Sequence, residues 1–172
     1  MDVSNIEGVT QYLSFQLGEE LFAIEVSHVR EVLEFIKITH VPGAPEHLKG
    51  MINVRGSVVP VMDMHCKLGM PPIENSINTR IIVAELPMGD DTVVLGMIAD
   101  SVKEVLDLRE EDIEPPPRIG NKYNILTKGI AHSGENFIII LDIENITSGN
   151  SFKNQGMPAP GEEMPQTEAA GI

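Results

Sequence analysis

The sequence predicts an all-β protein that consists of two small β-barrels in tandem. Three observations support this fold class. Short runs of β-branched and apolar residues alternate with turn signals, helical patterns are few, and the chain contains an internal repeat. Self-similarity at a regular spacing indicates duplicated architecture, and one copy alone is too small to be comfortably stable. We therefore expect the two halves to support each other, with function at the seam between them.

The repeat is clearest in two segments of the same pattern. Residues 27–34 read SHVREVLE and residues 100–107 read DSVKEVLD. Two further pairs match: KGMINVRGSVVPVMDM (49–64) with KGIAHSGENFIIILDI (128–143), and QYLSFQL (11–17) with RIIVAEL (80–86). The copies differ in detail, because only the first carries Asn53-x-Arg55-Gly56 and only the second carries the prolines 115–117. We expect the shared segments to preserve the fold and the differences to govern partner choice.

The strand signals follow one another along the chain. They predict strands at residues 11–17, 21–25, 51–54, 57–63, 80–86, 92–98, 125–132 and 137–141. Arg55-Gly56 predicts a hairpin turn, and Pro60 predicts an edge or a bulge because proline cannot donate to a ladder. Residues 137–141 (FIIIL) are apolar throughout, as in a strand buried on both faces. We expect single helical turns at the start of residues 27–33 and of their repeat, at 65–68 and at 142–146.

Composition and charge exclude several classes of function. The net charge is −14, and residues 85–114 hold ten acids against Lys103 and Arg109, which argues against nucleic acid and anionic membrane as partners. A single cysteine, Cys66, excludes an internal disulfide and fits a reducing compartment. No apolar run approaches a membrane-spanning length, and residues 1–8 lack the features of a signal peptide. We expect a cytoplasmic protein without direct membrane insertion.

The sequence also lacks the usual signs of catalysis. It contains no phosphate-binding loop and no nucleophile elbow, and its five histidines never have zinc-site spacing. Asp63, His65 and Cys66 lie close together, but a turn with an incidentally buried thiol explains them better than a metal site. Residues 110–112 (EED) are better explained as a solvated helix start than as an acid–base pair. We expect no enzyme activity, no cofactor and no metal.

Residues 50–63 resemble the signature of the CheW coupling proteins of bacterial chemotaxis. The matching pattern is Gly50-x-x-Asn53-x-Arg55-Gly56-x-x-x-Pro60-x-x-Asp63. The resemblance extends over about residues 9–146 and includes the segments 11–34, 38–50, 96–106 and 112–117. It implies two interleaved, five-stranded SH3-like barrels around a shared apolar junction, in a CheW-like domain at residues 9–147. Residues 1–8 are then a flexible N-terminus, and the polar residues 148–172 a disordered tail.

The resemblance further implies a non-catalytic adaptor in chemotaxis signal transduction. Such a protein joins the tip of a methyl-accepting chemotaxis receptor to the regulatory domain of a CheA-type histidine kinase, in membrane-associated receptor arrays. The alternative is a CheW-like regulatory or ligand-sensing module of a non-flagellar chemosensory pathway. An adaptor needs two unlike surfaces. One is an apolar groove for a helical receptor hairpin, which the resemblance places at the barrel seam, and the other is a barrel edge for kinase contact.

The resemblance assigns residues to these surfaces. The receptor groove would include Val29, Glu31, Val32, Arg55, Ile81, Gly96 and Val102, and kinase contact would involve Glu114 and Ile119 on the proline loop. Gly50, Asn53, Gly56, Pro60 and Asp63 would have structural roles. Core packing explains the three valines equally well, and Gly96 could serve only a close backbone approach. Arg55 could be an ordinary surface residue of the turn. We favour a functional or site-supporting role instead, in which its guanidinium binds a carboxylate with both arms and holds the hairpin in place.

Overall fold

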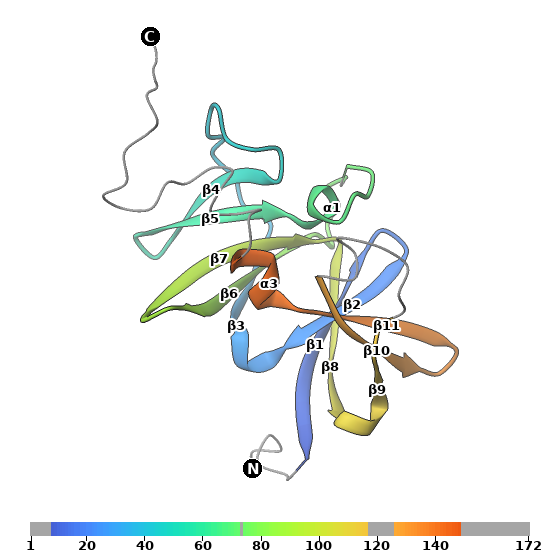
Figure 1. The fold of residues 1–172 in the computed structure, drawn as a ribbon. Helices are drawn as coiled ribbons and strands as arrows, with labels where there is room; N and C mark the ends of the chain where they lie inside the picture. The colour runs from blue at the N-terminus through green and yellow to red at the C-terminus, as the bar shows by residue number, and fades with distance from the viewer. Residues whose placement is uncertain (1–7, 73, 117–125, 149–172) are drawn as a thin grey trace.

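The computed structural model describes residues 8–72, 74–116 and 126–148, which form two β-sheets and a few short helices (Figure 1). The expected N-terminal segment 1–8 and tail 148–172 lie almost wholly outside these residues, so both stay predictions. The strands are β1 (Val9–Leu17), β2 (Glu20–Glu25), β3 (Val29–Glu34), β4 (Leu48–Val54), β5 (Ser57–Asp63), β6 (Arg80–Met88), β7 (Asp91–Ala99), β8 (Ser101–Arg109), β9 (Ile113–Glu114), β10 (Thr127–Ser133) and β11 (Asn136–Leu141). The helices are α1 (Met64–Lys67), α3 (Ile143–Ser148) and the 3-10 turns η2 (Val26–His28) and η3 (Glu110–Asp112).

Each sheet combines strands from both halves of the sequence. The six-stranded sheet has the order β8-β1-β2-β11-β10-β9, and the five-stranded sheet has the order β3-β6-β7-β5-β4. The first two strands of each half therefore pair with the last strands of the other half. This confirms the mainly-β fold of two sheets. The sixth strand, β9, has only two residues, and its counterpart in the other sheet is an isolated bridge between Thr39 and Met51.

The repeated segments 27–34 and 100–107 form the exchanged edge strands β3 and β8. β3 pairs with β6, and β8 pairs with β1. Both strands contain a β-bulge directly after the first valine of the repeat: Arg30 is the extra residue in β3, and Lys103 and Glu104 together face Ser14 in β8. Bulges twist an edge strand and re-aim a side chain, so the repeat encodes a bulged edge with a basic residue at the bulge.

The largest apolar cluster lies at the junction between the two sheets, and each barrel has a smaller interior cluster of its own. Side chains alternate between the two environments along a strand. In β11, Ile139 and Leu141 belong to the junction, whereas Ile138 and Ile140 fill the barrel interior. This explains why residues 138–141 are all apolar. The expectation of burial is wrong for Phe137, which is 60% exposed at the start of the strand.

The β4–β5 hairpin has the predicted two-residue turn. Arg55 and Gly56 have φ angles of 50° and 89°, and two positive φ angles are the mark of a type I′ turn. The side-chain oxygen of Asn53 accepts a hydrogen bond of 2.9 Å from the N–H of Gly56. β5 is an inner strand, but its pairing with β7 begins only at Val61, so Pro60 precedes the shared ladder. Asn53, Arg55 and Gly56 therefore define the hairpin turn, and Pro60 occupies a part of β5 that does not pair with β7.

The helical turns agree in part with the sequence. Asp63 accepts from the N–H of Cys66 at the start of α1, and Asp142 accepts from the N–H of Asn145 at the start of α3. These equivalent aspartates are thus helix caps. η2 precedes β3 as expected, but the repeat has no such turn, since only Asp100 separates β7 from β8. Within the described residues, no helix combines the length and apolar character needed to cross a membrane.

Candidate partner-binding site

Arg55 at the tip of the β4–β5 hairpin holds Glu31 of β3 with both arms of its guanidinium. Nη1 donates to Oε1 at 3.1 Å, and Nη2 donates to Oε2. The hydrogen bond and charge of Arg55, together with the charge of Arg30, outweigh the effect of burial and lower the pKa of Glu31. The same hydrogen bond raises the pKa of Arg55. The sequence allowed such a fork onto some carboxylate, and the structure identifies Glu31 as its partner.

Stability alone does not explain an arginine at this position. A residue other than glycine in the left-handed region costs about 1–2 kcal/mol, and Asn or Asp is better tolerated there. The Arg55 side chain is 69% exposed, and solvent screening leaves so exposed an ion pair with little effect on stability. The two contributions at best cancel. Arg55 is therefore better explained by what its guanidinium does at the surface.

The Arg55–Glu31 pair borders a groove of about 390 Å³ that opens onto the interior cluster of the five-stranded barrel, to which Val59 and Val83 belong. Its remaining lining is mostly aliphatic and comes from four strands and the bulge of β3: Arg30, Val54, Ser57, Val58, Val59, Val83 and Val94. Val58 is 67% exposed and extends the apolar lining towards solvent. Aliphatic walls beside charged groups are suited to an amphipathic partner segment.

Two of the expected receptor residues lie beneath this groove rather than in it. Ile81 has no exposed surface and belongs to the barrel's interior cluster together with Val83. Gly96 is also buried, and a Cβ placed there would lie 3.0 Å from Cγ2 of Ile81. A direct contact of Ile81 with a partner is therefore wrong for this conformation, because alternation along β6 points its side chain into the barrel. Ile81 and Gly96 support the groove wall from inside.

The expected valines of β3 differ in their environments. Val29 is half-buried against the junction, in agreement with the core-packing alternative. Val32 is 40% exposed, and it follows Glu31 directly on the same strand. Val32 is therefore available to a partner that binds along β3.

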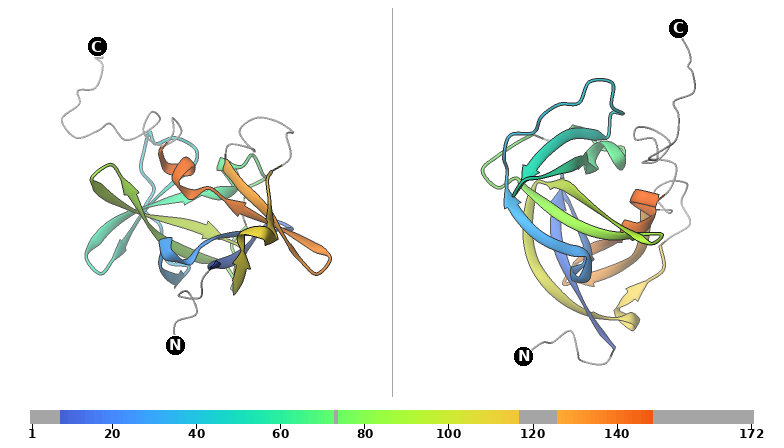
Figure 2. Two further views of the ribbon diagram at one scale, coloured as in Figure 1. Left: turned by 60° about the horizontal axis from the view of Figure 1, so that its bottom comes forward. Right: turned by 90° about the vertical axis from the view of Figure 1, so that its left-hand side faces the viewer.

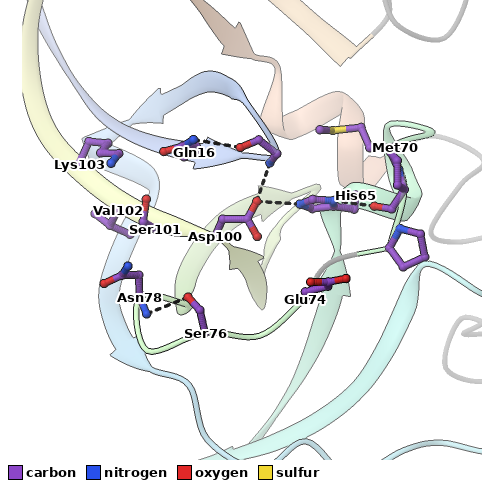
Figure 3. Close-up of a pocket in the computed structure, with 13 residues that line it drawn as sticks. Gln16, His65, Met70, Glu74, Ser76, Asn78, Asp100, Ser101, Val102 and Lys103 are labelled. Atoms are coloured by element: carbon purple, nitrogen blue, oxygen red, sulfur yellow. Dashed lines mark hydrogen bonds and ion pairs between the residues drawn. The ribbon is translucent and has the colours of Figure 1, made fainter.

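Val102 lines a different pocket, of about 670 Å³, between the β1–β2 turn, the segment after α1 and the start of β8 (Figure 3). None of the other expected receptor residues lines this pocket. The structure thus brings Glu31 and Arg55 together, with Ile81 and Gly96 behind them, and leaves Val102 apart. The expected single groove at the seam is not formed by these residues as a set.

Sequence reasoning missed the pair His65 and Asp100, which joins the two halves at this second pocket (Figure 3). Nε2 of the buried His65 lies 3.1 Å from Oδ2 of Asp100, and Nδ1 lies 2.7 Å from the carbonyl oxygen of Pro71. The same carboxylate oxygen accepts from the N–H of Gly18. The sequence offered a role for His65 only as a possible metal ligand. Among the described residues, no group of three or more potential ligand side chains could hold a metal ion.

A second ion pair that the sequence did not predict joins Lys128 to Glu25, with Nζ 2.6 Å from Oε2. Burial raises the pKa of Glu25, but the hydrogen bond and charge of Lys128 outweigh it and hold this pKa below its usual value. Burial likewise lowers the pKa of Lys128, and Glu25 reverses the effect. Lys128 is the bulge residue between the paired positions Thr127 and Gly129, which aims its side chain away from the ladder.

The expected kinase residue Glu114 lies on the other barrel. Glu114 of β9 is exposed, and its carboxylate lies 3.3 Å from Nε2 of His132. The His132 ring packs edge-on against the exposed Phe137, with 4.9 Å between ring centroids. Ile119 lies outside the described residues. Figures 1 and 2 show the β10–β11 hairpin, which carries His132 and Phe137, at the end of the molecule opposite the β4–β5 hairpin.

Comparisons with known proteins agree with this architecture. The family model for the CheW-like domain matches residues 11–150. The chain is 33% identical to the chemotaxis protein CheW of Klebsiella aerogenes, over 87% of this chain and 90% of the relative. It is 29% identical to the probable chemotaxis protein CheW of Rhizobium etli, over 83% of this chain and 90% of that one.

A solved structure gives the same result. The crystal structure of the scaffolding protein TtCheW from Thermoanaerobacter tengcongensis matches with a TM-score of 0.74 and 33% identity, over 84% of this chain and 90% of that chain. Membership of a family of coupling proteins is consistent with the expectation that the chain is not an enzyme. Taken with the exchanged sheets and the Gly50–Asp63 motif, these matches show that the chain belongs to the CheW family of chemotaxis adaptor proteins.

Proposed function

We propose that this protein couples the tip of a methyl-accepting chemotaxis receptor to the regulatory domain of a CheA-type histidine kinase, and that these partners recruit it to membrane-associated receptor arrays. It acts without chemistry of its own, by presenting two surfaces at once. Family membership supports the adaptor role, and the two hairpins at opposite ends of the molecule provide separate places for two partners (Figure 2).

The observation that carries the receptor assignment is the Arg55–Glu31 pair beside the groove that it borders. We call this groove the valine groove, after its lining residues Val54, Val58, Val59, Val83 and Val94. The geometry of the pair is bidentate, the turn that carries Arg55 is strained, and the exposed ion pair contributes little to stability. The groove suits the aliphatic face of a receptor helix, because such helices bind through apolar side chains at every third or fourth position. Val32 is exposed as well, but it lies on the opposite face of β3 from Glu31, so a receptor would contact it only by also covering this edge strand.

The kinase assignment is supported by the far end of the six-stranded sheet. Glu114, His132 and Phe137 form an exposed cluster there, and an aromatic side chain that is 60% exposed is an effective anchor at an interface. Each single contact is expected to be weak, with avidity supplied by the array.

Receptor binding by Arg55→Ala protein tests the proposal. Binding of a chemoreceptor signalling fragment should weaken by about tenfold or more, which corresponds to about 1.4 kcal/mol. Lys103→Ala is the matched control, because it removes an exposed cation from the second pocket instead. Both variants should keep the wild-type circular dichroism spectrum. Wild-type binding and kinase activation by Arg55→Ala, or a loss confined to Lys103→Ala, would contradict the assignment of the groove.

The sensor alternative has its own test. Mass spectrometry of the purified protein should find no bound small molecule, and a kinase regulatory domain should co-purify with it. A bound ligand without kinase binding would instead favour the regulatory or ligand-sensing module.

A further inference from the structure

Arg30 is a second arginine in the groove of Arg55, and the bulge of β3 places it there. Val29 pairs with Ala84 and Glu31 pairs with Val83, which leaves Arg30 as the extra residue between them. The extra residue of a bulge is released from the regular alternation, so its side chain can point to a surface that a regular strand would deny it. Arg30 lines the groove together with Arg55 and Glu31.

The charges in the groove do not balance. Both carboxylate oxygens of Glu31 accept hydrogen bonds from Arg55. Within the part of the chain that the structure describes, no carboxylate forms an ion pair with Arg30, although its charge reaches Glu31 and helps to lower the pKa of that group. The groove therefore has two cations and one anion, in a protein whose net charge is −14. An excess of positive charge at this place favours an acidic ligand group.

We propose that Arg30 binds a carboxylate of the partner segment that occupies the valine groove. This inference rests on the proposed function, since it takes the groove to be the receptor site. The partner segment would carry an Asp or Glu beside aliphatic residues at helical spacing, with the carboxylate on Arg30 and the aliphatic side chains on Val54, Val58 and Val94. Arg30 thus selects among receptors, whereas Arg55 and Glu31 shape the groove.

The internal repeat supplies a matched control for this proposal. Lys103 lies at the corresponding bulge of β8 and is also an exposed cation, but it lines the second pocket. A change of its charge alters the net charge of the protein by the same amount at a different place. Any general electrostatic effect of the −14 protein on its partner should therefore be equal in Arg30→Glu and Lys103→Glu.

The experiment measures binding of a chemoreceptor signalling fragment by wild type, Arg30→Gln, Arg30→Glu, Lys103→Glu and Arg55→Ala. Arg30→Gln should weaken binding several-fold, and Arg30→Glu by about tenfold or more, because it opposes a carboxylate to a carboxylate. The affinity of wild type should fall between about 0.05 and 0.5 M salt, and that of Arg30→Gln should fall less. Lys103→Glu should bind like wild type.

Two outcomes would overturn the proposal. In the first, Arg30→Gln and Arg30→Glu bind like wild type while Arg55→Ala loses binding, which leaves the proposed function intact. In the second, Lys103→Glu loses as much as Arg30→Glu, which reveals a general charge effect. If Arg55→Ala also binds like wild type, the proposed function itself fails. Arg30→Gln removes the charge but keeps a polar side chain, and it does not place a second acid beside Glu31, so its result does not depend on Arg30→Glu folding.

Discussion

The hydroxyl of Ser14 makes both hydrogen bonds that the backbone of Glu104 would otherwise lack. It donates to the carbonyl oxygen of Glu104 at 2.8 Å and accepts from its N–H at 3.1 Å. The contact lies at the bulge where one residue of β1 faces two of β8, and it joins segments 90 residues apart in sequence. A side chain thus replaces part of the ladder where the repeated strand of the second half meets the first half.

Ser14→Ala should lower the free energy of unfolding by about 0.5–1.5 kcal/mol, because it removes both hydrogen bonds of the part-buried N–H and carbonyl of Glu104. Chemical denaturation measures this change. Gln11→Ala is the control, since it removes an exposed hydrogen bond to Asp107 across the same two strands and should cost less than about 0.5 kcal/mol. Equal effects of the two substitutions would show that the bulge does not depend on the serine.

Arg55→Asn should leave the protein at least as stable as wild type while it weakens receptor binding. Asn tolerates the positive φ of the type I′ turn, so relief of strain offsets the loss of the exposed ion pair with Glu31. Thermal unfolding and receptor binding are measured on the same preparation. A clear loss of stability would instead mean that the ion pair mainly holds the hairpin.

Gly50→Ala should destabilise the fold by about 3 kcal/mol, because a Cβ at Gly50 would lie 2.2 Å from the backbone oxygen of Thr39. The strand would have to move away from the segment that it bridges. Gly134→Ala is the control: its φ is +64°, but nothing lies within 4 Å of the added Cβ, so it should cost about 1 kcal/mol. Denaturation midpoints compare the two, and a smaller effect at Gly50 would contradict the steric explanation.

Ile81→Ala and Val32→Asp should distinguish a residue that supports the fold from a residue that contacts the receptor. Ile81 is fully buried, so its truncation should cost about 2–5 kcal/mol of stability, and any loss of binding should follow the loss of fold. Val32 is 40% exposed, so Val32→Asp should keep the fold and lose receptor binding. Circular dichroism measures the fold of each variant, and a receptor pull-down measures its binding. An unfolded Val32→Asp protein would restore the core-packing explanation for this valine.

The ion pair between Glu25 and Lys128 should contribute stability over a defined pH range. Because the pKa of Glu25 is lowered from 4.5 in the folded state, its contribution is fully present above pH 4.5 and is lost as the pH falls through the lower folded value. The raised pKa of Lys128 gives a contribution that is present below pH 10.5 and lost as the pH rises through the higher folded value.

Glu25→Gln should therefore remove the loss of stability below pH 4.5 that this pair causes, and Lys128→Met should reduce it in the same way. Both side chains are partly exposed, so the effect should be about 1 kcal/mol or less. Denaturation of the three proteins across acidic pH measures it. An unchanged acid dependence in both variants would rule out the pair as its source.

Local patterns in the sequence were sufficient for the elements themselves. The alternation of apolar residues predicted the main strands, Arg55-Gly56 predicted the hairpin turn, and the repeat predicted two related halves. These features depend on neighbours within a few residues. The same reasoning was wrong where burial depends on what covers a strand: Phe137 is exposed although its strand is apolar, and Ile81 faces the barrel interior.

By itself, the sequence determined the strands, the duplication and the motif that leads to the CheW family. Only the tertiary structure decided that the repeated strands β3 and β8 exchange partners between the halves, and that Arg55 meets Glu31 while Val102 lines another pocket. The physical reason is that alternation fixes which residues share a face of a strand, whereas the identity of the neighbouring strand depends on contacts far apart in sequence.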